Sequence, residues 1–290
     1  MRADDRPRRS VLYMPGSNAR ALEKARSLPA DALILDLEDA VLPSEKTAAR
    51  TQVAEAVRAR GFGRREVAIR INGLDTPWGH DDLAAAVAAA PDAILVPKVG
   101  RPEDLRPVEA AVGPDGPAIW AMMETPAGIL QAEAIAAGVP RLVAFILGTN
   151  DLVKELGAAH VPGRAPVATS LSLCLLAARA HGLACIDGVF NDLGDADGLA
   201  AECAAGRDMG FDGKTLIHPG QIDAANRAFA PSDAALTLAR RQVAAFAEAE
   251  AAGQGVAVLD GRIVEHLHVE SARRLLAQAE AIAALEATPS

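Results

Sequence analysis

Eight short apolar segments recur along the chain, and each is followed by a stretch with the apolar spacing of a helix. Uninterrupted apolar runs are typical of parallel strands covered on both faces, and eight strand–helix units are enough to close a sheet. The pattern predicts a TIM (β/α)8 barrel, with a doubly wound open sheet as the alternative. The predicted strands span 10–14, 32–37, 67–71, 93–97, 118–123, 142–147, 184–189 and 214–218. The predicted helices span 19–28, 44–60, 80–90, 102–112, 126–137, 168–182, 195–210 and 220–230.

The last sixty residues follow a different pattern. A helix is expected over 232–252, a Gly-bounded hairpin over 253–267 and a closing helix over 269–287. We therefore expect a barrel domain over 1–230 and an appended segment over 231–290. This segment would act as a lid or as an oligomer contact.

Composition excludes several classes of protein. The hydrophobic content of 50% predicts a globular chain, and the net charge of −9 disfavours a nucleic-acid partner. No apolar run approaches the roughly 18 residues needed to cross a bilayer, and no secretory leader is recognisable, so we expect a cytoplasmic protein without a membrane partner.

Cys174, Cys185 and Cys203 are odd in number and lie in apolar surroundings. They are expected to be buried thiols.

Polar residues gather at the carboxyl ends of the predicted strands, where parallel barrels build their active sites. Glu124 and Asp151 follow the fifth and sixth strands, which are expected to be neighbours. Two carboxylates that leave other positions to water and substrate suit Mg²⁺. The alternative is that each acid caps the helix that follows it.

Arginine is unusual inside an apolar strand, and Arg70 lies in one. A substrate carboxylate would be a natural bidentate partner for its guanidinium. The acids that end the neighbouring strand are equally available partners, namely Asp36, Glu38 and Asp39. Arg20 and Lys24 lie four residues apart on one face of the first predicted helix, where they could receive phosphates or form a solvated face.

The chain resembles the HpcH/HpaI aldolase and citrate lyase beta-chain family, the CoA-ester lyases. The resemblance extends from about Arg9 to Leu276. It rests on these segments in order: RSVLYMPGSN, ADALILDLEDAV, AIRINGLDTPWG, ILVPKV, METPAG, GTNDL, GFDGKTLIHPGQI and GRIVEHLHVESARRLL. It implies a Mg²⁺-dependent barrel, commonly a homotrimer or hexamer. Such enzymes cleave CoA thioesters such as citryl-, malyl- or citramalyl-CoA, or form them, at the C–C bond between a small 2-oxo acid and the acetyl carbon of acetyl-CoA.

The resemblance also implies roles for individual residues. Glu124 and Asp151 would ligate the metal, and Arg70 would hold a substrate carboxylate or the thioester oxygen. Glu38 and Asp39 would form an acidic shell around metal-bound water. Arg20 and Lys24 would bind the phosphates of CoA. Substrate would also contact Glu124 and the segment Gly148, Thr149 and Asn150.

Two positions depart from the family's pattern. Many relatives have an acid where this chain has Asn150, which would alter the acceptor pocket. The family often reads GxMID or GxMVD near the C-terminus, with an aspartate that donates a proton in a neighbouring subunit. Glu265 takes that place here, with one more methylene.

Two other functions remain open. The first is a CoA-independent class II aldolase that acts on a 2-oxo acid and an aldehyde with the same metal pair. The second is a noncatalytic partner in a larger lyase assembly. Arg20, Lys24 and the C-terminal segment favour a CoA ester over the first alternative. The intact acids and Arg70 count against the second.

Overall fold

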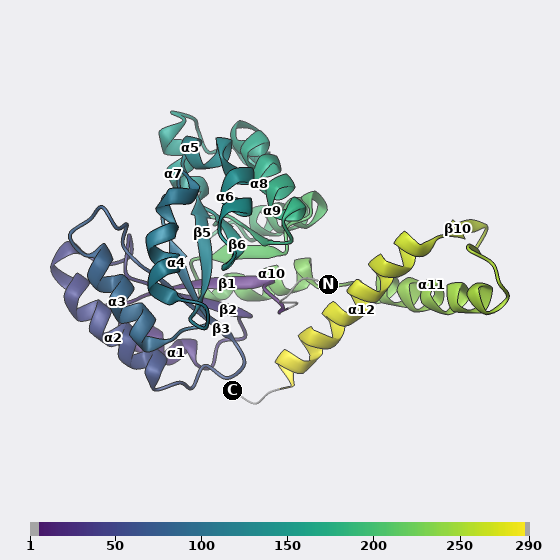
Figure 1. The fold of residues 1–290 in the computed structure, drawn as a ribbon, viewed down its shortest axis with the longest axis horizontal. Coiled ribbons are helices and arrows are strands. Elements are labelled where there is room, and N and C mark those ends of the chain that lie inside the picture. Colours follow the sequence, from purple (N-terminus) through teal and green to yellow (C-terminus); the bar gives the residue numbers. More distant parts are fainter. Residues whose placement is uncertain (1–5, 288–290) are drawn as a thin grey trace. The chain divides into compact units, whose positions relative to one another are not determined.

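The computed structural model describes residues 6–287, and within them eight parallel strands close into a barrel (Figure 1). Each strand pairs with the next one along the chain, and the last pairs with the first. The predicted TIM (β/α)8 fold is confirmed. The barrel strands are β1 (Ser10–Pro15), β2 (Ala32–Asp36), β3 (Glu66–Arg70), β4 (Ala93–Val96), β5 (Ala118–Met123), β6 (Leu142–Leu147), β7 (Ala184–Asp187) and β8 (Gly213–Leu216).

Helices connect successive strands and lie outside the barrel (Figure 1). They are α1 (Ala19–Ala25), α2 (Lys46–Arg58), α3 (Gly79–Ala89), α4 (Arg106–Val112), α5 (Pro126–Leu130), α6 (Ala132–Gly138), α7 (Thr149–Glu155), α8 (Ala168–Ala180), α9 (Ala196–Met209) and α10 (Ile222–Phe229). Short 3₁₀ turns occur at η1 (Pro43–Glu45), η2 (Pro102–Asp104), η3 (Pro162–Val167) and η4 (Pro219–Gln221).

Two helical details differ from the prediction. The single helix expected over 126–137 is divided at Gln131, whose φ of −108° and ψ of 14° lie outside the helical region. Helix α7 is absent from the predicted spans, and the sequence indicates it only as a helix that Asp151 could cap. It has seven residues and buries only Thr149, Leu152 and Val153, too few apolar positions to show a helical period.

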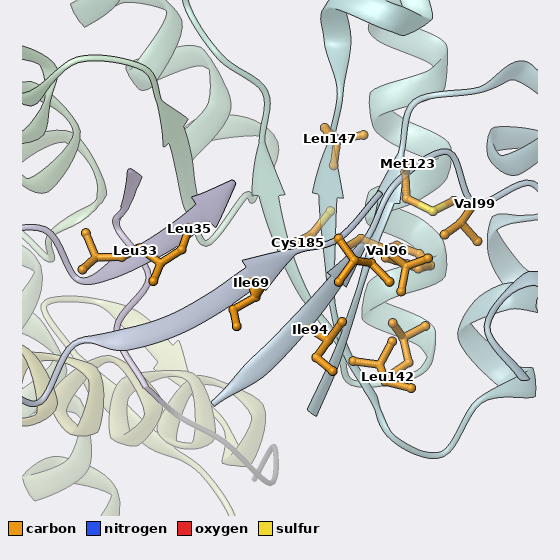
Figure 2. Packing of buried hydrophobic residues seen from close by; sticks show 14 of the residues in the cluster. Leu33, Leu35, Ile69, Ile94, Val96, Val99, Met123, Leu142, Leu147 and Cys185 are labelled. Atoms are coloured by element: carbon orange, nitrogen blue, oxygen red, sulfur yellow. The ribbon is translucent and has the colours of Figure 1, made fainter. Parts of the chain in front are cut away.

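Alternation along the strands divides the apolar residues between two layers. One layer lies between the sheet and the helices and includes Leu33, Leu35, Ile69 and Ile94 (Figure 2). The other lines the inside of the barrel with alanines and larger aliphatic side chains around the fully buried Trp120. Because both faces are buried, the strands are mostly apolar, as the sequence indicated.

The amino-terminal end of the barrel is held by two buried ion pairs. Arg8 contacts Glu66 at 2.5 Å, and Arg9 contacts Asp31 at 2.8 Å. The Arg8 guanidinium also lies 5.6 Å from the ring centre of Trp120, at the inner layer. The inside of the barrel is therefore filled from this end, which leaves the carboxyl ends of the strands for a site.

Contacts within the chain divide it into two units, one of residues 8–229 and one that contains residues 230–287. The second unit consists of α11 (Asp233–Ala251), β9 (Ala257–Leu259), β10 (Arg262–Val264) and α12 (His266–Glu286). The expected order of helix, hairpin and helix is confirmed. Its own apolar cluster includes Phe246, Val264 and Val269. No helix within residues 6–287 is long and apolar enough to cross a membrane.

Candidate active site

The alternation of side chains along the barrel strands carries three charged residues inward at their carboxyl ends. Asp36 stands two residues after the inward-facing Ile34, and Arg70 stands two residues after Ala68. Glu124 stands two residues after Met122 by the same period. A cavity of about 320 Å³ lies at this end of the barrel. Its lining includes Tyr13, Asp36, Asp39, Arg70, Met122, Glu124, Gly148, Thr149, Asn150 and Asp151.

Arg70 is anchored by the acids that end β2. Its Nε and Nη2 each donate to one carboxylate oxygen of Asp36 at 2.6 Å, and its Nη1 lies 2.7 Å from Glu38 Oε2. Asp39 is more distant, at 3.8 Å, and mostly exposed. Burial opposes the charge of Arg70, but Asp36 and the neighbouring charges raise its pKa. Arg70 therefore pairs with the acids that end the neighbouring strand, which was one of the two expected kinds of partner. A substrate could reach only Nη1, which it would share with Glu38.

Tyr13 and Met122 form the apolar side of the Arg70 pocket. The guanidinium carbon lies 5.0 Å from the ring centre of Tyr13, within the range of a cation–π contact. The Tyr13 hydroxyl lies 3.7 Å from Met122 Sδ. Burial is the main reason why the pKa of Tyr13 is raised. Sequence reasoning missed Tyr13, although it stands at an inward position of the first strand.

Lys98 is the most important site residue that the sequence did not reveal. It follows β4 with a φ of +52°, and its backbone N–H donates to Glu124 Oε1 at 2.8 Å. Its ammonium lies 2.5 Å from Glu38 Oε1 and 3.9 Å from Asp151 Oδ2. The segment PKVG ends the fourth predicted strand, so the rule that located Glu124 and Asp151 could have included Lys98.

Glu124 does not cap the helix that follows it. Thr125 takes that role, because its hydroxyl accepts from the N–H of Gly128 at 3.0 Å. Glu124 is instead almost fully buried beside the cavity. Burial, with smaller contributions from the carboxylates of Glu38 and Asp151, raises its pKa to about 8 despite the Lys98 hydrogen bond.

Asp151 lies in the first turn of α7, and its carboxylate lines the same cavity as Glu124. Within residues 6–287, no three His, Cys, Asp or Glu side chains gather as a cage for a metal ion. A metal here would therefore have two protein ligands and would take its remaining ligands from water and substrate, as Mg²⁺ commonly does. The donor set fits such an ion, because it consists of carboxylate oxygens that line one cavity.

The predicted substrate segment packs tightly around the acids. A Cβ atom at Gly148 would lie 2.5 Å from Glu124 Cβ, which leaves room for glycine only. Thr149 and Asn150 line the cavity. The side-chain amide of Asn150 exchanges two hydrogen bonds with that of Asn191, at 3.1 and 2.7 Å.

The structure does not bring Arg20 and Lys24 into this cavity. Both are exposed on α1 and line a separate open groove together with Ser27 and Gly61. Glu265 belongs to the second unit, where its N–H donates to His268 Nδ1 at 3.0 Å at the start of α12.

A closed (β/α)8 barrel with acids and cations gathered at the carboxyl ends of its strands has the architecture of a barrel enzyme. The sequence model of the HpcH/HpaI aldolase/citrate lyase family matches residues 9–219. The chain belongs to this family, a lyase family whose similar members include proteins that process CoA esters.

Three similar proteins are informative. A (3S)-malyl-CoA thioesterase of Cereibacter sphaeroides strain KD131 is 58% identical over 97% of this chain and 98% of its own. An L-malyl-CoA/beta-methylmalyl-CoA lyase of the same species, strain ATH 2.4.9, is 35% identical over 96% of each chain. The structure of CitE from Mycobacterium tuberculosis with magnesium, acetoacetate and coenzyme A is 29% identical, with a TM-score of 0.77. That match covers 96% of this chain and 100% of CitE.

Proposed function

We propose that this protein is a Mg²⁺-dependent enzyme that acts on the CoA thioester of a small 3-hydroxy acid of the malyl type. The observation that carries this proposal is that Glu124 and Asp151 line one cavity with Arg70. Support also comes from the similar proteins, because two of them are named for malyl-CoA and a third was solved with magnesium and coenzyme A.

Glu124 and Asp151 would hold the ion, which supplies Lewis-acid polarisation of a substrate carbonyl oxygen when bound. Arg70 places a fixed positive charge beside the same space, where it would stabilise negative charge that develops on the thioester oxygen. Glu38 and Asp39 would accept hydrogen bonds from water in the cavity. Burial raises the pKa of Glu38, while Arg70 and Lys98 oppose that rise.

Thioester hydrolysis is the first candidate reaction, because the relative with 58% identity is named a thioesterase. Water would add to the thioester carbonyl carbon, and its proton would pass to Glu38 or Asp39. The C–S bond would then break, and the thiolate of CoA would take up that proton. The products would be free CoA and a hydroxy dicarboxylic acid.

Cleavage of a C–C bond is the second candidate, and the relative named as a lyase favours it. A base would take the proton of the 3-hydroxyl, and the C–C bond would break to release a 2-oxo acid. Glu265, from another copy in a homotrimer or hexamer, would protonate the enolate of acetyl-CoA. The same residues would also serve the reverse condensation.

One assay separates these reactions. Malyl-CoA is incubated with the protein, with and without Mg²⁺, while free thiol and 2-oxo acid are measured in parallel. Hydrolysis releases a thiol without an oxo acid, and cleavage releases an oxo acid without a thiol. Glu124→Gln should abolish both, whereas Glu103→Gln, an exposed acid on η2, should change neither. Undiminished turnover in Glu124→Gln would contradict the metal assignment. If the wild type turns over no CoA ester, the alternatives are favoured, namely a CoA-independent aldolase or a noncatalytic subunit.

A further inference from the structure

Lys98 occupies a backbone conformation that L-residues with side chains rarely adopt. Its φ is +52°, and it stands two residues after the end of β4, in contact with Glu124 and Asp151 of the acidic cavity. Residues held in such conformations persist where the surrounding structure fixes them, and they are concentrated at functional sites. Here the conformation aims the backbone N–H at Glu124, to which it donates at 2.8 Å.

The ammonium of Lys98 lies close to two more acids. It lies 2.5 Å from Glu38 Oε1 and 3.9 Å from Asp151 Oδ2, so this one residue contacts acids on three different strand ends. Its side chain is 46% exposed, which leaves room for the ammonium to move. The other cation of the cavity, Arg70, is held by two hydrogen bonds that it donates to Asp36.

The charges of the cavity do not balance. Asp36, Glu38, Asp39, Glu124 and Asp151 carry five negative charges when ionised, and Arg70 and Lys98 carry two positive charges. Lys98 therefore offsets part of the charge that a divalent ion would otherwise meet. A cation 3.9 Å from Asp151 also repels any ion that this carboxylate binds.

We propose that Lys98 is a positioning residue that orders Glu38 and Glu124 for the reaction and, by its charge, weakens the binding of the divalent ion at Glu124 and Asp151. This inference rests on the proposed metal site. A purely structural lysine would make the opposite contribution to metal affinity, because losing it would disorder the ligands. The sign of the change in affinity therefore separates the two roles.

The test is a titration with Mn²⁺ alone, followed by the electron paramagnetic resonance signal of the free ion. Lys98→Met keeps a side chain about as long as the aliphatic part of lysine and removes the charged ammonium. It should bind Mn²⁺ about tenfold more tightly than the wild type, the order expected for one charge in a partly solvated site. Lys98→Arg, which keeps the charge, should bind with nearly wild-type affinity. Arg106→Met removes one charge from an exposed side chain of α4 and should change nothing.

The second measurement is steady-state turnover of the CoA ester. Lys98→Met should lower kcat for the CoA ester with little change in KM, because Glu38 loses one of its two cationic partners and keeps only Arg70. If Lys98→Met does not fold, Lys98→Gly replaces it, since glycine accepts the positive φ and retains the N–H that Glu124 needs. Equal or weaker Mn²⁺ binding by these variants would overturn the role of Lys98. Absence of Mn²⁺ binding in the wild type would instead overturn the metal site, and the inference with it.

Discussion

Asp36 and Arg70 are register partners on neighbouring barrel strands, and their side chains form a bidentate ion pair inside the barrel with two hydrogen bonds of 2.6 Å. Both side chains are almost fully buried. The pair fixes the plane of the guanidinium, so that Nη1 is directed to Glu38 and the cavity. Asp36 thus orients the cation on which the proposed chemistry depends.

The first prediction follows from this pair. Asp36→Asn removes the negative charge and leaves the buried guanidinium without its main partner, so the free energy of unfolding should fall by about 3 kcal/mol. Turnover should fall as well, because Arg70 loses its fixed orientation. Urea unfolding measures the first effect. The matched control is Asp39→Asn, whose carboxylate is exposed and more distant, and it should cost less than about 1 kcal/mol. Equal losses in the two variants would contradict the proposed anchoring.

The cysteines give a prediction about pH. All three are buried, and burial raises the pKa of Cys203 to about 11 and that of Cys174 to about 12. A raised pKa means that the folded protein keeps these thiols protonated above pH 9, where unfolded thiols lose their protons. Folding stability contributed by the thiols should therefore decline as the pH rises from about 9 toward 11. At pH 8, an aromatic disulfide reagent should label none of them in the native protein and all three after unfolding. Rapid native labelling would contradict their burial.

Arg20 and Lys24 remain predicted ligands of the CoA phosphates. Replacing either by Met should raise KM for the CoA ester severalfold and leave kcat nearly unchanged, because the phosphates are remote from the reacting bond. The control substrate is the corresponding thioester of pantetheine, which lacks the nucleotide and its phosphates. Its KM should be the same in variant and wild type. A parallel rise for both substrates would place these residues outside phosphate recognition.

Glu265 separates the two candidate reactions. Glu265→Gln should abolish C–C cleavage, which requires protonation of the enolate, and should spare thioester hydrolysis, which does not. Subunit exchange tests whether the residue acts in another copy. A mixture of Glu124→Gln and Glu265→Gln proteins should recover part of the cleavage activity, since some sites would combine intact partners. No recovery after verified exchange would argue against action between subunits.

The sequence located the barrel because a physical constraint repeats along it. Strands buried on both faces must be apolar, and so the segments around Leu33 and Ile69 could be recognised without any structure. The ring of polar residues at the strand ends was predictable for the same reason, because an apolar run that stops at a charge marks the rim of the barrel. Glu124 and Asp151 were found in this way.

What the sequence left open depends on three-dimensional placement. Arg70 had several possible partners, and only the strand register selects Asp36. The sequence left open that Glu124 caps the helix after it, and the structure shows that the Thr125 hydroxyl caps α5 instead. The place of Lys98 at a strand end could be read from the sequence, but its positive φ and its backbone hydrogen bond to Glu124 could not, because glycine is the only residue type that favours that conformation.

The central claim is that a divalent ion binds between Glu124 and Asp151. The most direct measurement is anomalous diffraction from crystals soaked in Mn²⁺ and a 2-oxo acid. We predict one strong peak at about 2.1–2.2 Å from a carboxylate oxygen of each residue, with the oxo acid as a further ligand. A cavity without a peak, with Glu124 still bound to the Lys98 amide and the ion elsewhere, would contradict the account.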